Sequence, residues 1–278
     1  MIRCRLCLVL VAALVAAGLA SAVHADDAPI RALLVIGGCC HDYKHQKDLL
    51  TQGISARANV EWAIAYDPDG STRHLNPIYE KDDWAKGFDV VVHDECSADV
   101  KDLKVIDRIL KPHHEGLPGV ALHCAMHCYR SEGWPQKVTP WFEFTGLPST
   151  GHGAQAPIAV VFLDKNVPIT RSLQDWTTVN EELYNNSAGK LLDTAQPLAR
   201  GTQSFTDRRG RTTSQEFVTV WTNLYNGKAR VFGTTLGHNN ATCNDPRYLD
   251  LVTNGLLWSV GKLDAAHLKP AKKVLLDK

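Results

Sequence analysis

Residues 119–128 read GVALHCAMHC, a short apolar run that leads directly into two histidines and two cysteines. The apolar part predicts a buried strand, and the polar part then lies at the carboxyl end of that strand. In open α/β sheets, ligands bind outside the carboxyl ends of the strands. The stretch therefore predicts both the class of fold and the edge of the sheet at which its chemistry occurs.

Apolar runs alternate with helical patterns along the chain. Strands are predicted at residues 30–36, 60–66, 88–93 and 118–122, and helices at residues 44–57 and 100–112. Further strands are predicted at residues 156–162, 216–221 and 230–235, before a helix that begins at Asp245-Pro246 and stops at Gly261. This order favours an α/β fold of the flavodoxin-like type, with a mostly parallel central sheet and helices on both faces.

The two ends of the chain differ from this core. Residues 1–25 combine Arg3 and Arg5 with an apolar run and a small-residue cleavage site, which predicts a signal peptide and a periplasmic or secreted protein. The apolar run is too short for a membrane span, so no stable membrane insertion is expected. Residues 26–263 are expected to form a single domain, because no repeat or linker divides them, and residues 264–278 a polar, solvated tail.

The charge balance restricts the partners. Lys and Arg together number 30, and so do Asp and Glu, so nucleic acid is not expected as a partner. A homodimer is compatible with a domain of this size. Neither a Gly-x-Ser-x-Gly motif nor a phosphate-cradling glycine motif occurs, which argues against a serine hydrolase and a nucleotide site.

The cysteines beyond the signal peptide leave their redox state open. They are Cys39, Cys40, Cys96, Cys124, Cys128 and Cys243. Cys39 and Cys40 are not expected to bond to each other, because a disulfide between neighbours strains the peptide between them. A contact of Cys39 or Cys40 with Cys124 is one alternative, and buried thiols that pack as small apolar groups are another.

Polar clusters follow several of the predicted strands, and parallel strands would bring them to one edge of the sheet. The clusters are His41-Asp42-Tyr43, His93-Asp94-Glu95-Cys96, His123 to Cys128, Gly151-His152-Gly153, Glu181-Glu182-Leu183-Tyr184 and Gly237-His238-Asn239-Asn240. Each has a structural alternative, such as a helix cap for His41, a loop acid for Glu95 or a satisfied core residue for His127. The remaining histidines expected at the surface are His113, His114 and His267.

Metal binding is one chemistry that these histidines permit. His123 and His127 have a spacing at which helical residues share a face, but no His-Glu-x-x-His motif accompanies them. A divalent ion such as zinc, held by some of His41, His123 and His238 with a carboxylate, therefore stays open beside metal-free proton transfer.

The same clusters resemble the ThuA-like family, which is named for trehalose utilisation and placed among class I glutamine amidotransferase-like folds. The matching stretches are residues 37–43, 91–96, 123–127, 181–184, 221–223 and 227–238, together with the final helix. The resemblance implies that fold and carbohydrate utilisation. At the turn where amidotransferases place a nucleophilic cysteine, this chain has His123, and Cys124 follows one residue later. Hydrolysis of glutamine is therefore not expected.

These observations predict a hydrolase or isomerase-like enzyme whose small-molecule substrate is a disaccharide, glycoside or keto-sugar. The expected catalytic residues are His41, His123, His238 and Glu182, because imidazoles titrate near neutral pH and suit proton transfer. The expected substrate-binding residues are Tyr43, Glu95, His127, His152, Tyr184 and Asn239. Two alternatives stay open: a non-catalytic sugar- or metal-binding protein, and a thiol enzyme that uses Cys39 or Cys124.

Overall fold

The computed structural model describes residues 28–186, 191–206 and 208–277. The predicted signal peptide, residues 1–25, lies outside this part of the chain. No helix within it is long and apolar enough to cross a membrane.

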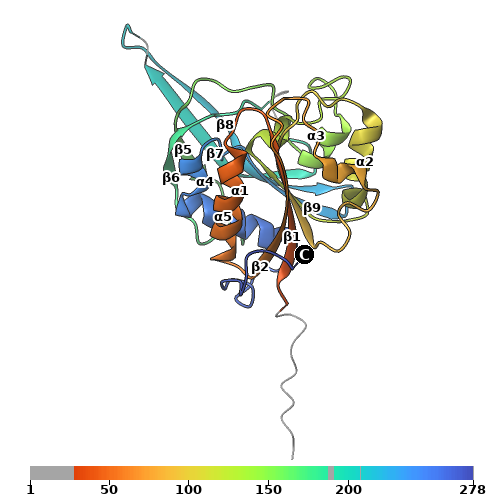
Figure 1. Ribbon diagram of the computed structural model, residues 1–278. Helices are drawn as coiled ribbons and strands as arrows, with labels where there is room; N and C mark the ends of the chain where they lie inside the picture. Colours follow the sequence, from red (N-terminus) through yellow and green to blue (C-terminus); the bar gives the residue numbers. More distant parts are fainter. Residues whose placement is uncertain (1–27, 187–190, 207, 278) are drawn as a thin grey trace, which may run out of the picture.

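One mixed sheet of nine strands, counted over the described residues, organises the molecule (Figure 1). Its order is β2-β1-β3-β4-β9-β8-β7-β5-β6. The parallel strands are β2 (Val60–Asp67), β1 (Ile30–Gly38), β3 (Val90–Cys96), β4 (Gly119–Leu122) and β9 (Ala229–Thr234). The antiparallel strands are β8 (Thr212–Tyr225), β7 (Ala195–Thr206), β5 (Ala156–Phe162) and β6 (Trp176–Glu181).

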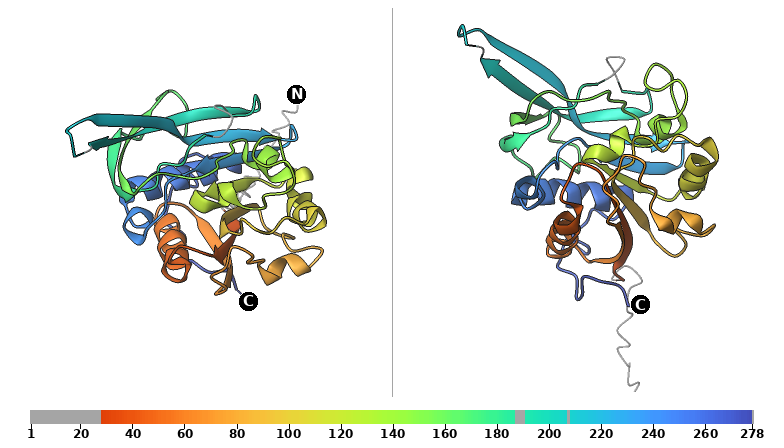
Figure 2. Two further views of the ribbon diagram at one scale, coloured as in Figure 1. Left: turned by 90° about the horizontal axis from the view of Figure 1, so that it is seen from above. Right: turned by 45° about the horizontal axis from the view of Figure 1, so that its top comes forward.

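The prediction of a mostly parallel sheet is wrong, because the second half of the chain is built from hairpins. Residues 226–228 join β8 to β9, and Asn226 and Gly227 have positive φ values of 51° and 65°, as in tight hairpin turns. A turn this short reverses the chain, so the two strands pair antiparallel. β7 and β8 form a second, long hairpin that extends beyond the body of the molecule (Figure 2).

Helices cover both faces of the sheet, as predicted (Figure 1). α1 (Tyr43–Ser55) and α5 (Pro246–Ser259) pack on one face, and α2 (Leu103–His114) and α3 (Pro140–Thr145) on the other. The alternation of β1 supplies both cores: Leu34 faces the first pair of helices and Leu33 the second. The shorter helices are η2 (Pro77–Glu80), η3 (His123–His127) and α4 (Asn240–Cys243).

The C-terminal segment runs along the edge of the sheet, with most of its described side chains exposed. The Trp62 N–H of β2 donates to the Val274 carbonyl, and the Leu276 N–H donates back to the Trp62 carbonyl. His267, on the same segment, is buried, and its carbonyl accepts from the Asn59 N–H just before β2. The expectation of a surface position is therefore wrong for His267, because an edge strand offers unpaired backbone groups that the segment satisfies.

His113 also lies inside the protein, contrary to expectation. Its Nδ1 lies 2.7 Å from the Leu117 carbonyl and its Nε2 3.1 Å from Nε2 of His93. Burial, followed by the nearby His93 imidazole, lowers the pKa of His113 from 6.5 to about 3. The imidazole therefore stays neutral in the folded chain near neutral pH.

The free energy of unfolding is expected to fall as the pH drops from 6.5 towards 3, in part because of His113. Over this interval the unfolded chain binds a proton at His113 and the folded chain does not. One such group lowers stability by up to about 1.4 kcal/mol per pH unit. Urea unfolding across this range should give a shallower loss for His113→Asn than for the unaltered protein. Equal slopes would show that His113 makes no contribution.

Candidate functional site

His123 sits at a sharp turn directly after β4. Its φ is 46°, a left-handed conformation that residues other than glycine rarely adopt, and η3 starts at the same residue. The imidazole is buried, and its Nδ1 lies 2.7 Å from the Thr235 carbonyl. Nδ1–H therefore donates to that carbonyl, and Nε2 is left facing the site.

His41 reaches the same place from the end of β1. The strand ends in Gly37 and Gly38, at φ values of 148° and 98°, and a Cβ on either would meet backbone oxygen of a neighbouring segment. These two glycines let the chain pass close to β2 and β3 and deliver the next residues to the edge of the sheet. His41 Nδ1 then lies 3.2 Å from the His238 carbonyl.

His238 follows β9 in a loop that Glu181 holds. The Glu181 carboxylate accepts hydrogen bonds from the backbone N–H groups of Gly237 and His238. Asn239 caps α4 with its side-chain oxygen and donates to the Asn180 carbonyl, so it fixes the loop and does not point freely into a pocket. The motif at residues 237–240 therefore supplies the His238 imidazole and also Asn239, which fixes the loop that positions this imidazole.

Glu182 is the centre of the cluster. Its Oε2 lies 3.5 Å from His123 Nε2, 3.3 Å from His152 Nε2 and 3.2 Å from His238 Nδ1. Gln155, which the sequence did not single out, contacts both Glu182 Oε1 at 3.3 Å and His238 Nε2 at 2.8 Å. Its only sequence signal is its place in the loop that also carries His152.

The three principal imidazoles are close neighbours. The ring centroids of His41 and His123 are 4.6 Å apart, those of His41 and His238 5.0 Å, and those of His123 and His238 5.5 Å. One ligand nitrogen from each ring lies within 4.8 Å of the other two. The structure thus brings together all four residues expected to be catalytic, from the ends of β1, β4, β6 and β9.

The environment pushes the pKa values of these groups apart. Burial, followed by the charges of His123 and His238, lowers the pKa of His41 to about 3. Burial opposes protonation of His123, but the Glu182 carboxylate beside it leaves the His123 pKa raised. Burial opposes ionisation of Glu182, yet the imidazoles of His123 and His238 hold its pKa below the usual range. The pKa of His41 is thus lowered and that of the neighbouring His123 raised, so the two imidazoles differ in proton affinity within one cluster.

Aromatic rings line one side of this cluster. The Tyr184 hydroxyl lies 3.2 Å from His123 Nε2, and the His127 and His152 rings stack on Tyr184 with centroids 4.3 Å and 5.2 Å away. His152 is the most exposed of these, at 35 % of its side chain, and so is placed to meet a ligand. Tyr43 is buried with its ring edge against His41, at a centroid distance of 5.4 Å.

Glu95 has different surroundings from the other expected site residues. It is fully buried, and its carboxylate accepts hydrogen bonds from the hydroxyls of Tyr79 at 2.7 Å and Tyr129 at 2.8 Å. His93 Nδ1 lies 2.9 Å from the same carboxylate. Because these partners occupy its oxygens, Glu95 belongs to a buried polar network and not to the accessible site.

The cysteines next to the site are paired. Cys39 is bonded to its neighbour Cys40, and Cys96 to Cys124. The expectation that the two neighbouring cysteines stay apart is therefore wrong: Cys40 adopts a left-handed φ of 83°, a conformation that sequence cannot show. Cys39 Sγ lies 3.3 Å from Cys96 Sγ, so the two pairs touch directly below the histidines.

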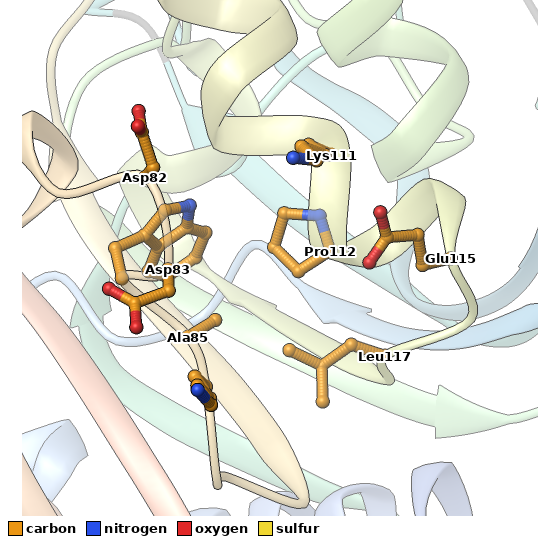
Figure 3. Close-up of a pocket in the computed structure, with 9 residues that line it drawn as sticks. Asp82, Asp83, Ala85, Lys111, Pro112, Glu115 and Leu117 are labelled. Carbon is orange, nitrogen blue, oxygen red and sulfur yellow. The ribbon is translucent and has the colours of Figure 1, made fainter.

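A pocket of about 400 Å³ opens onto the cluster. Its lining comprises Cys40, His41, Asp42, His238, Asn239, Asn240 and Ala241. A second pocket, of about 430 Å³, lies between the end of α2 and the loop around Asp82 (Figure 3). Its lining is mainly charged surface residues, such as Asp83 and Lys111, and includes none of the expected site residues. The first pocket is therefore the candidate binding site.

Comparison with known proteins defines the family. Two solved structures of ThuA-like proteins resemble this fold. The one from Parabacteroides merdae has a TM-score of 0.60 at 20 % identity and covers 84 % of this chain and 91 % of its own. The one from Bacteroides uniformis has a TM-score of 0.59 at 16 % identity and covers 84 % of this chain and 93 % of its own.

No curated protein matches the sequence significantly. The family described as "ThuA: Trehalose utilisation" matches residues 37–259, which include every strand from β2 to β9 and the whole candidate site. The matched region also contains the motifs at residues 37–43 and 227–238 on which the resemblance was based. The chain belongs to the ThuA trehalose-utilisation family.

Proposed function

We propose that this protein is a carbohydrate-utilisation enzyme that acts on a disaccharide, glycoside or keto-sugar by acid–base chemistry. The observation that carries this proposal is the position of Glu182 within 3.5 Å of His123, His152 and His238. The raised pKa of His123, which lies beside Glu182, suits this imidazole to proton transfer. The family supplies the substrate class.

The roles follow from the contacts. His123, held through Nδ1 by the Thr235 carbonyl, presents Nε2 to the substrate as proton donor. His41, with its pKa lowered to about 3, is neutral near pH 7 and accepts a hydrogen bond from a sugar hydroxyl. His152, the exposed ring of the stack, offers a face against which a sugar ring packs, and the buried Tyr184 supports it from the other side. Export of the protein from the cell and a homodimeric state remain expectations of the same proposal.

A screen of disaccharides and keto-sugars with product NMR tests the proposal. We expect the unaltered protein to convert at least one of these sugars. Replacement of Glu182 by Gln should slow that conversion by about 10²-fold, because the imidazoles lose their carboxylate partner. Glu216→Gln, an exposed carboxylate on β8, is the matched control and should keep full activity.

The alternative is a non-catalytic sugar-binding protein that uses the same pocket. It predicts saturable binding of a sugar by calorimetry with no product in the NMR spectrum. The lining of the pocket, which includes His238 and Asn240, provides hydrogen-bonding groups for such binding. This outcome would contradict the enzymatic proposal.

A further inference from the structure

We infer that His41, His123 and His238 form a binding site for one divalent first-row transition-metal ion such as Zn²⁺, with Glu182 beside it. The inference goes beyond the proposed function at the same site: an ion bound to Nε2 of His123 takes the place of the proton that this ring donates in the metal-free scheme, and supplies Lewis acidity there. Its starting observation is that one nitrogen from each of the three rings lies within 4.8 Å of the other two. Three imidazoles and a carboxylate are a donor set suited to zinc and its neighbours.

The hydrogen bonds behind the rings prepare two of the nitrogens for a metal. His123 Nδ1 faces the Thr235 carbonyl at 2.7 Å, and His41 Nδ1 faces the His238 carbonyl at 3.2 Å. A carbonyl accepts only, so each Nδ1 carries a hydrogen and each neutral ring keeps its lone pair on Nε2. Metal-bound histidines are oriented in the same way by backbone carbonyls.

The third histidine, His238, has a buried ring nitrogen whose hydrogen-bonding capacity is unused. His238 Nδ1 is buried and makes no hydrogen bond to the described residues, although Glu182 Oε2 lies 3.2 Å away. Gln155 contacts the other ring nitrogen, Nε2, at 2.8 Å. Because an amide offers both a donor and an acceptor, a half-turn of Gln155 lets its oxygen accept Nε2–H and leaves the Nδ1 lone pair for the ion, at the expense of the hydrogen bond from Gln155 to Glu182 Oε1.

The distances between the nitrogens of the three rings are compatible with binding of one metal ion. Zinc–nitrogen distances of about 2.1 Å place tetrahedral ligands about 3.4 Å apart. Small rotations of the three rings would therefore bring their nitrogens into ligand positions. A bound ion of this kind supplies Lewis acidity to a sugar hydroxyl or carbonyl. The pocket of about 400 Å³ that His41 and His238 line gives the ion a path from solvent.

The cysteines below the histidines are the competing ligands. Cys96 also falls within 4.8 Å of other donors, in one group with Cys39 and Cys40 and in another with His41 and Cys124. In the structure these four sulfurs are consumed in two disulfides, so they offer no thiolate. Of these groups, the histidine group is therefore the one with free ligand atoms. A cysteine variant distinguishes an ion bound by the histidines from an ion bound by the sulfurs.

The test titrates Zn²⁺ and Co²⁺ into the purified, chelator-treated protein without sugar, using calorimetry and the visible absorption of bound Co²⁺. We expect one ion per chain. His41→Ala and His238→Ala should each weaken binding by more than about 100-fold, and Gln155→Ala by about 10–100-fold. His114→Ala, an exposed histidine on α2, is the matched control and should bind like the unaltered protein.

The outcomes divide clearly. Stoichiometric binding that both histidine variants abolish supports the site. Absence of binding, or binding that the two variants leave unchanged, overturns it. Binding that survives His238→Ala but disappears in Cys96→Ser also overturns it and places the ion among the sulfurs. Because no sugar is present, a negative sugar screen leaves this result intact, and a negative titration leaves metal-free acid–base catalysis intact.

Discussion

Replacement of His123 by asparagine is expected to lower the turnover of any sugar that the protein converts by about 10²–10⁴-fold. The imidazole presents Nε2 to Glu182 and to the Tyr184 hydroxyl, and asparagine cannot hold a transferable proton there. Asparagine is chosen because the position has a φ of 46°, which asparagine tolerates better than most residues. Steady-state kinetics with product NMR measures the effect.

Circular dichroism and urea unfolding keep this test interpretable. The variant should retain the spectrum of the unaltered protein, so that the loss belongs to chemistry and not to folding. His114→Asn, exposed on α2, should keep full turnover. Retained turnover in the folded His123→Asn protein would remove His123 from the catalytic set and favour His152, which also contacts Glu182, as proton donor.

Replacement of Glu95 by leucine is expected to destabilise the fold by at least about 3 kcal/mol. The Glu95 carboxylate accepts hydrogen bonds from Tyr79 and Tyr129 and contacts His93, and all of these groups are buried. Leucine leaves the two hydroxyls without their acceptor, and each orphaned buried group costs about 1–3 kcal/mol. Urea denaturation measures the loss, with Glu216→Leu on the exposed face of β8 as control.

A double rescue distinguishes lost hydrogen bonds from poor packing. In the Glu95→Leu background, Tyr79→Phe and Tyr129→Phe remove the orphaned hydroxyls and should restore part of the stability. A direct role of Glu95 in substrate binding predicts the opposite pattern: a small change in stability and a large rise in KM. That pattern would show that Glu95 is a substrate-binding residue in spite of its burial.

Local signals in the chain predicted the elements that pack closely. The apolar run that ends at Leu122 became β4, and Asp245 caps the helix that starts at Pro246, with its side chain accepting from the Arg247 N–H. β6 and β7 were missed for a physical reason. β6 is a short segment with half of its residues exposed, and β7 contains Pro197 and Gly201, both of which are uncommon inside strands.

The candidate site was predictable in composition but not in arrangement. His41, His123, His238 and Glu182 were expected because each follows, or lies close to, an extended segment, and the structure brings them together. The role of Gln155 was not predictable, because a single glutamine in a loop has no distinguishing pattern. The separation of Glu95 was also hidden, since Tyr79 and Tyr129 come from segments that only the folded chain brings to it.

The sequence by itself determined the local properties: the strand ends, the helix caps and the residue types available for chemistry. These follow from the period of apolar residues and from backbone preferences, which act over a few positions. Only the tertiary structure decided that half of the sheet is antiparallel, that Glu182 lies among three imidazoles, and that His113 and Glu95 are buried. Such outcomes depend on contacts between distant segments, and no local pattern encodes their distances.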